Sequence, residues 1–236
     1  MQKHMQKITT NNFGYLWITI ICLLAAGAKA QDFFDDDARF WLYTKLNKNW
    51  TKKLETEFIL QHRFHNNIAD FSQINGNVEV KYRVSKAVKL IGGGVYGLRR
   101  KMTGRYGERY QVYGGFRVKQ KINYFTIVYR NLVQAQMSEN DVIRKRGANF
   151  YDRNKLTLKY ELSKRFEIYT AGEVNLPVSI YGPAYINRFR WFSGLVYTIN
   201  RNSYLQTYFL FQRKYGYDRL PPRDFIYGLT YGYNLR

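Results

Sequence analysis

The C-terminal segment 225–235 alternates between two kinds of side chain, and this pattern constrains the fold more than any other feature of the chain. Side chains along a β-strand point alternately to opposite faces. On one face they are large and apolar or aromatic: Phe225, Tyr227, Leu229, Tyr231, Tyr233 and Leu235. The other face carries Ile226, Gly228, Thr230, Gly232 and Asn234. A wide apolar face backed by a small or polar one is typical of a strand with lipid on one side and a lumen on the other.

The first thirty residues have the three parts of a secretory signal peptide. These are the basic residues Lys3, His4 and Lys7, an apolar run over 13–26, and the small-x-small cleavage site Ala28-Lys29-Ala30. The run is short for a helix that must cross a hydrocarbon core of ~30 Å, so we expect cleavage before Gln31 rather than a membrane anchor. The only cysteine, Cys22, lies inside this run, and it lacks the small residues that precede a lipoprotein cysteine. We therefore expect a mature chain without disulfides.

Composition favours a single membrane domain over residues 31–236. The chain has 22 tyrosines and 16 phenylalanines but only 4 prolines, and no segment after residue 30 has the apolar length of a transmembrane helix. Every backbone donor in lipid must be paired, so a chain without apolar helices crosses a membrane as a closed barrel.

The charge balance is strongly basic. The net charge of +21 falls to +18 when the three lysines of residues 1–30 are removed. Such an excess is usual in nucleic-acid-binding proteins, but export separates the chain from nucleic acid, and no recognition-helix or RNP-like pattern is present. We expect outer-membrane lipid and the phosphates of lipopolysaccharide to be the anionic partners instead.

Alternation with a period of two recurs along most of the chain. It is clearest over 50–65, 74–83 and 155–162, and it is least clear over 122–135, where both faces are apolar. Further strands are predicted at about 38–46, 87–99, 108–118, 166–175, 185–198, 203–215 and 224–235.

The predicted connections alternate in length. Tight ones are expected at 47–49, 85–86, 119–121, 163–165 and 200–202, and longer ones near 66–73, 100–107, 136–149, 176–184 and 216–223. Short periplasmic turns and longer extracellular loops are characteristic of outer-membrane barrels. A soluble β-sandwich alternates as well, but it keeps its apolar face inward and has fewer aromatic residues. The prediction is therefore an all-β, transmembrane, antiparallel up-and-down β-barrel.

The strand count leaves an open choice. The predicted segments number eleven, whereas bacterial single-chain barrels have even numbers of strands. With the tight turns on the periplasmic side, the first of eleven strands would have to start on the outer side. We therefore expect ten to twelve strands and prefer twelve.

Short motifs along nearly all of the mature chain support a family resemblance. They are Phe40-Trp41-Leu42-Tyr43, the turn Leu46-Asn47-Lys48-Asn49, Leu60-Gln61-His62-Arg63-Phe64, Arg153-Asn154-Lys155-Leu156, Ala171-Gly172-Glu173 and Asn187-Arg188-Phe189-Arg190. In these the chain resembles the domain-of-unknown-function 2490 family of bacterial outer-membrane β-barrel proteins. The resemblance implies a barrel and brings no catalytic residues with it.

If the apolar faces point to lipid, charges of both signs face the lumen. The acidic ones are Glu55, Glu57, Glu79, Glu161, Glu167 and Glu173, and the basic ones are Arg63, Lys81, Arg83, Arg99, Arg109, Arg117, Arg153, Lys155, Lys159, Arg188 and Arg190. A salt-bridged interior would pair these costly buried charges and give a barrel of structural or binding type. Their basic excess would instead suit a narrow, porin-like pore that prefers small anions, because charged rings set selectivity. We favour the salt-bridged interior.

Two further groups have expected roles outside the lumen. The predicted loops carry basic residues that we expect to face lipopolysaccharide or an extracellular anion, namely Arg100, Lys101, Arg105, Arg144, Lys145 and Arg146. In the last strand, Gly228, Tyr231 and Tyr233 resemble the signal that barrel-assembly machinery recognises, although the terminal Leu235-Arg236 departs from the usual terminal aromatic residue.

An enzyme is the third hypothesis, as a lipid-modifying hydrolase. The mature chain has two histidines, and alternation predicts that His62 faces lipid and His65 faces inward. A serine nucleophile would have to pair His65 with Ser72 or Ser138 from loops. We predict no catalytic residues, no metal site and no cofactor. The sequence does not define an oligomeric state.

Overall fold

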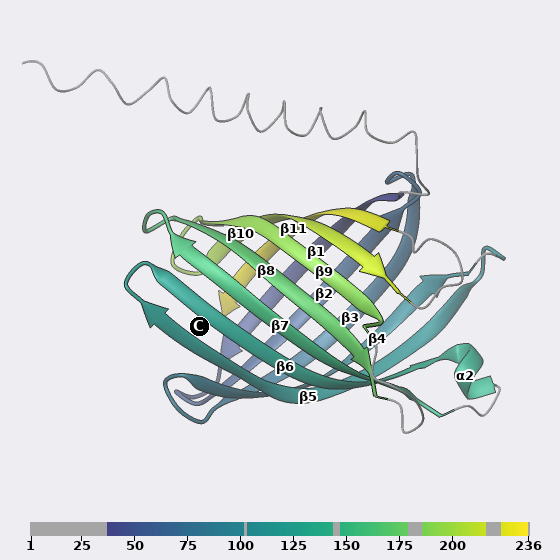
Figure 1. Ribbon diagram of the computed structural model, residues 1–236, viewed down its shortest axis with the longest axis horizontal. Helices are drawn as coiled ribbons and strands as arrows, with labels where there is room; N and C mark the ends of the chain where they lie inside the picture. Colours follow the sequence, from purple (N-terminus) through teal and green to yellow (C-terminus); the bar gives the residue numbers. More distant parts are fainter. Residues whose placement is uncertain (1–36, 102, 144–146, 179–185, 216–222, 236) are drawn as a thin grey trace, which may run out of the picture. The chain divides into compact units, whose positions relative to one another are not determined.

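The computed structural model describes residues 37–101, 103–143, 147–178, 186–215 and 223–235. Within these residues eleven β-strands close into one barrel and cross it obliquely (Figure 1). The elements are β1 (Asp37–Asn49), β2 (Leu54–His65), β3 (Asp70–Arg83), β4 (Val88–Arg100), β5 (Tyr106–Ile122), β6 (Phe125–Ser138), α2 (Glu139–Ile143), β7 (Asn149–Glu161), β8 (Phe166–Pro177), β9 (Arg188–Thr198), β10 (Ser203–Lys214) and β11 (Arg223–Leu235). Each strand pairs with its sequence neighbours, which confirms the predicted up-and-down barrel.

β1 and β11 close the barrel as a parallel pair, whereas the other strand pairs described are antiparallel. Their register places Trp41 beside Gly228 and Leu46 beside Tyr233. In an up-and-down order of eleven strands, the first and last strands run in the same direction, so the closing pair must be parallel. The preference for twelve strands is therefore wrong, because an even number is required only where the closing pair is antiparallel.

β1 starts at the end of the barrel that carries the longer connections. The backbone N–H of Ile68, in the connection after β2, donates to the carbonyl oxygen of Ala38 over 3.1 Å. The other end of the barrel carries the tight turns, and β1 and β11 both run toward it. This agrees with the expectation for an odd strand count, in which the first strand starts on the side opposite the tight turns.

Two predicted turns are displaced along the chain. Residues 47–49 belong to β1, and the turn is 50–53, where the hydroxyl of Thr51 accepts from the backbone N–H of Leu54 over 2.9 Å. Residues 119–121 belong to β5, and the turn is 123–124, where Asn123 has a φ of 53°. Asparagine tolerates this left-handed conformation, which a two-residue hairpin turn requires. The predictions of these two turns from polar composition alone were therefore wrong by a few residues.

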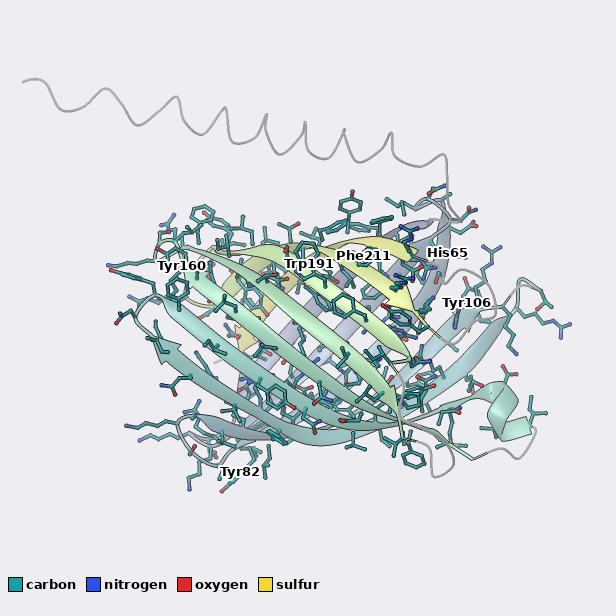
Figure 2. The ribbon with its side chains drawn as sticks, in the orientation of Figure 1. His65, Tyr82, Tyr106, Tyr160, Trp191 and Phe211 are labelled. Atoms are coloured by element: carbon teal, nitrogen blue, oxygen red, sulfur yellow. The ribbon has the colours of Figure 1, made fainter. Side chains whose placement is uncertain are left out.

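The outer and inner surfaces of the barrel differ as the alternation predicted. Outward side chains such as Val112 and Leu156 are more than half exposed, whereas inward Leu210 and Ile226 are fully buried. Tyr82 and Tyr160 lie toward the tight-turn end and Tyr106 toward the other end (Figure 2). Aromatic side chains therefore lie toward both ends of an apolar outer surface, as they do where a barrel meets the two membrane interfaces. Among the described residues, no helix has the length and hydropathy needed to cross a membrane.

An apolar cluster occupies one side of the barrel interior. Trp41, Tyr208, Leu210 and Ile226 are buried together, from β1, β10 and β11. Gly228 permits this packing, because a Cβ at that position would overlap the ring of Tyr208, its partner across the β10–β11 ladder. Gly228 thus has a packing role in the folded barrel, in addition to its predicted role in assembly.

We expect Gly228→Ala to lower barrel stability by about 1–3 kcal/mol, the usual cost of overpacking a filled interior. Gly172→Ala is the matched control, because a Cβ there meets no atom within 4 Å. Thermal unfolding followed by heat-modifiable gel mobility measures both variants. Equal melting temperatures for the two variants would contradict the packing role of Gly228.

Candidate functional site

A cavity of about 340 Å3 lies inside the barrel and is lined mainly by side chains from β1 to β9. Its charged lining is strongly unbalanced. Eight basic side chains, Arg63, Arg99, Arg109, Arg130, Arg153, Lys155, Arg188 and Arg190, face two acidic ones, Glu79 and Glu173. This imbalance makes the cavity the candidate functional site.

Glu173 is the centre of the charge network in the middle of the lumen. It is 1% exposed, and three guanidinium groups bind its carboxylate. The Nη atoms of Arg130, Arg153 and Arg190 lie 3.1, 3.0 and 2.9 Å from its oxygens. Arg190 also donates through Nε to Gln212 over 2.8 Å. The sequence singled out Glu173, Arg153 and Arg190 but not Arg130, because both faces of β6 looked apolar.

A second network lies toward the tight-turn end, and in it the charges are balanced. Lys81 lies 3.1 Å from Glu55 and 3.4 Å from Glu79, and it also pairs closely with Glu57. Lys89 binds Glu55 over 2.5 Å, and Lys45 lies 3.9 Å from Glu57, so three lysines face three glutamates. The sequence predicted four of these six residues on the inward face. Lys45 and Lys89 were missed, although both lie in predicted strands.

The remaining predicted lumen residues lie apart from these two networks. Lys159 pairs with Glu167 over 2.6 Å, and both side chains are only partly buried. Glu161 and Arg83 are the last residues of β7 and β3, so they lie at the tight-turn rim. There Glu161 pairs with the exposed Lys121 over 2.7 Å. Arg117 is half-buried in β5.

Four arginines toward the long-connection end form what we call the arginine cluster: Arg63, Arg99, Arg109 and Arg188. Within the described part of the chain, none of the four pairs with a carboxylate. Arg63 donates to Gln61 over 3.0 Å, and Arg109 donates to Gln136. The Arg188 charge interacts with those of Arg63 and Arg109, so like charges face one another. The Nε atoms of Arg63, Arg109 and Arg188 are buried and have no hydrogen-bond partner among the described residues.

Amide and aromatic side chains complete the cavity wall. The Arg63 guanidinium lies over the Trp41 ring, 4.2 Å from its centroid, and the Lys155 ammonium lies 3.7 Å from the centroid of Phe192. Such cation–π contacts hold a basic group without neutralising it. Nine amides also line the cavity, namely Gln61, Gln73, Asn75, Asn77, Gln111, Gln134, Gln136, Asn175 and Asn187. The wall can therefore bind a negative charge and donate and accept further hydrogen bonds.

The predicted basic loop residues are partly engaged with carboxylates. Arg100 lies 3.5 Å from Asp70, and Lys101 lies 2.8 Å from Glu139 in α2. The hydrogen bond from Lys101 holds the pKa of Glu139 below its usual range. Arg105 is exposed, and residues 144–146 lie outside the described residues.

The structure also places the residues of the predicted assembly signal in β11 and the two histidines of the hydrolase hypothesis. Tyr231 and Tyr233 lie on the outward face of β11, and Gly228 lies on its inward face. His62 packs against the outward Phe71, with ring centroids 6.2 Å apart. Nδ1 of His65 lies 3.3 Å from the carbonyl oxygen of Asp70. Among the described residues, no three His, Cys, Asp or Glu side chains gather in a way that could hold a metal ion.

The chain belongs to the DUF2490 family of proteins of unknown function, whose model matches residues 38–219. No curated protein gives a significant match. Among solved structures, the chain is similar to the NanC porin, with 12% identity and a TM-score of 0.49 over 78% of this chain and 92% of that one. The translocator domain of the autotransporter NalP from Neisseria meningitidis gives 11% and 0.42, over 70% of each chain. OmpT of Vibrio cholerae gives 10% and 0.36, over 68% of this chain and 54% of that one.

We expect Glu173→Gln to destabilise the barrel by about 3–5 kcal/mol, because it leaves three buried guanidinium groups without their common carboxylate. Glu161→Gln removes the same charge at the exposed rim and serves as the control, with an unchanged melting temperature expected. Thermal unfolding by circular dichroism tests the pair. If both variants melt like the parent protein, the Glu173 network does not hold the interior together.

Substitutions of Arg190 and Arg188 should differ in their effect on barrel stability, although the two residues are two positions apart on one face of β9. Arg190→Gln loses the hydrogen bond to Glu173, and bonds to charged groups contribute about 1.5–3 kcal/mol, so stability should fall. Arg188→Gln removes a charge that faces other arginines, so stability should stay constant or rise. Chemical denaturation of both variants measures the difference, and equal losses would contradict the division between network and arginine cluster.

Proposed function

We propose that this protein spans a bacterial outer membrane and that its lumen binds small hydrophilic anions at the arginine cluster. The observation that carries the proposal is the cavity lining of eight basic and two acidic side chains. The predicted export signal over residues 1–30, the apolar outer surface and the aromatic side chains toward both barrel ends support the membrane placement.

Holding the charges of the arginine cluster together is costly, and a bound anion would offset that cost. Like charges in a confined space repel one another, and the buried Nε groups of Arg63, Arg109 and Arg188 lose their hydration. A carboxylate or phosphate would accept hydrogen bonds from several guanidinium groups at once. The planar N–H donors of a guanidinium group match the oxygens of these anions in bidentate geometry. The Glu173 network shows the same chemistry within the protein, with one carboxylate held by three arginines.

The rest of the cavity indicates the kind of anion. Its volume of about 340 Å3 lies near the lower end of the roughly 300–1,000 Å3 range of ligand pockets, so the ligand is a small molecule. The nine amides favour a solute that carries hydroxyl, carbonyl or amide groups beside its negative charge. Among the described residues, the buried apolar cluster is confined to one side of the interior, which leaves little surface for a hydrophobic ligand.

A narrow anion-preferring passage is the second candidate function. It is favoured by the unequal distribution of charge along the lumen, with unneutralised arginines toward one end and the balanced Lys81 network toward the other. Basic residues toward one mouth concentrate anions there, and rings of charge set selectivity. Both candidate functions depend on the attraction of anions to basic residues in the lumen. They differ in whether the anions pass through the barrel.

Contact with lipopolysaccharide is proposed for the outer rim. Arg105 is exposed at the long-connection end, where phosphates of that lipid would lie if these connections are extracellular. Recognition of the last strand by barrel-assembly machinery is likewise proposed, with Tyr231 and Tyr233 accessible on its outward face.

One experiment tests the binding and the passage together. The protein purified from membranes is recorded in a planar bilayer under a KCl gradient, and its melting temperature is measured with and without phosphate or citrate. We expect a reversal potential of anion-selective sign and a higher melting temperature with the anions, since a ligand at 100 times its Kd adds about 2.7 kcal/mol. Changing the arginine cluster to glutamine should abolish both effects.

A control variant changes four basic residues of the tight turns to glutamine, namely Lys53, Lys86, Lys164 and Arg201. It loses the same charge as the arginine-cluster variant, but outside the lumen. It should therefore retain both the anion-selective reversal potential and the stabilisation by anions. Anion stabilisation without conductance would leave a binding barrel and exclude the passage. If the parent protein shows neither an anion-selective reversal potential nor stabilisation by anions, the proposed function is overturned.

A further inference from the structure

A hydrogen-bonded polar cluster lies on the outer surface of the barrel, on β6 and β7. It consists of Asn131, Asp152 and Asn154, and we call it the outer polar cluster. Nδ2 of Asn131 donates to Asp152 over 2.6 Å and to Oδ1 of Asn154 over 3.0 Å. Nδ2 of Asn154 donates to the second carboxylate oxygen of Asp152 over 2.9 Å. The Tyr129 hydroxyl donates to Asn154 over 2.5 Å.

The cluster lies outside the lumen, because its residues alternate with cavity-lining ones. Arg130 and Leu132 flank Asn131 and line the cavity, as do Arg153 and Lys155 beside Asn154. Adjacent side chains on a strand point to opposite faces, so the outer polar cluster faces away from the lumen. The register places Asn131 directly across from Asn154.

Its surroundings are those of the lipid-facing surface. Val133 lies across from Asp152 and is 51% exposed, and Leu156 follows Asn154 on the same face with 56% exposed. Along β7 this face begins with Phe150 and ends with Tyr160, so the polar residues lie between two aromatic positions. Asn131 is the seventh of the fourteen residues of β6. The cluster is therefore within the apolar surface rather than at its rim.

Lipid tails cannot satisfy such a cluster. An ionised carboxylate accepts about four hydrogen bonds, and Asp152 receives two. Asn154 retains one N–H of its amide group, and no bond to the amide oxygen of Asn131 is found in the described part of the chain. Polar and charged side chains in hydrocarbon are costly unless another protein surface pairs them.

We infer that the outer polar cluster is an interface between copies of this chain within the membrane. The unused groups of the cluster are complementary to themselves, because the free N–H of Asn154 in one copy can donate to the unfilled carboxylate positions of Asp152 in another. A surface that pairs with its own copy is what an isologous contact requires. The flanking Val133 and Leu156 would pack around the polar centre. The inference rests on the membrane placement proposed above, but not on anion binding.

Cysteine crosslinking in membranes tests the inference directly. The only native cysteine is Cys22, in the predicted signal peptide, so introduced cysteines report single positions. Leu156→Cys, beside the cluster, should form a dimer with a short bis-maleimide reagent. Leu42→Cys, on the outward face of β1 across the barrel, should not. Changing Asp152, Asn131 and Asn154 together to leucine in the Leu156→Cys background should reduce the dimer at least tenfold.

Each outcome has a meaning. A monomeric Leu156→Cys protein in the outer-membrane fraction overturns the interface while leaving the membrane placement intact. A crosslinked product with a different mass assigns the surface to another protein and overturns the pairing of copies. Absence of the chain from the membrane fraction overturns the membrane placement itself. If the triple variant fails to fold, the single change Asp152→Asn, which keeps the shape and removes the charge, replaces it.

Discussion

The rest of the structure depends on closure of the backbone hydrogen-bond ladder. A sheet in lipid must have no free edge, since each unpaired backbone group there costs several kcal/mol. Eleven strands can close in an up-and-down order only if β1 pairs with β11 in parallel, and this seam is present. Closure then decides which side of every strand faces inward.

Closure makes the interior a small space, so the inward side chains must match one another in size and in charge. The apolar cluster around Tyr208 fills one side of it, and Glu173 neutralises part of the positive charge in the middle. The lysine–glutamate pairs balance the charge toward the tight turns. The arginine cluster has no such balance within the described residues. Stability alone would favour neutral side chains there, and this is the basis of the anion site proposed above.

Sequence patterns predicted what depends on local alternation and missed what depends on closure. The two faces of residues 225–235 follow from composition, and Ile226 is indeed fully buried inside. The alternating segments number eleven, as the strands of the barrel do. The preference for twelve came from the general rule of even strand numbers, because alternation within a strand does not report how the first and last strands pair. Arg130 was missed since apolar residues of 122–135 fall on both faces of the predicted strand. The turn at Asn123 was displaced because a left-handed residue, not a polar run, marks it. The pairing of Lys81 with three glutamates needs register as well as pattern.

β7 shows how one strand serves both surfaces of such a barrel. Its successive residues Asp152, Arg153, Asn154 and Lys155 alternate between the outer polar cluster and the basic cavity. A slip of one residue would send Arg153 and Lys155 into lipid and turn Leu156 and Leu158 into the polar lumen, so the sequence strongly favours the observed register. Because the two surfaces are set by alternate residues, substitutions at 152 and 154 can disturb contacts between copies while leaving the cavity lining intact. The anion-binding and interface hypotheses can therefore be tested independently on one strand.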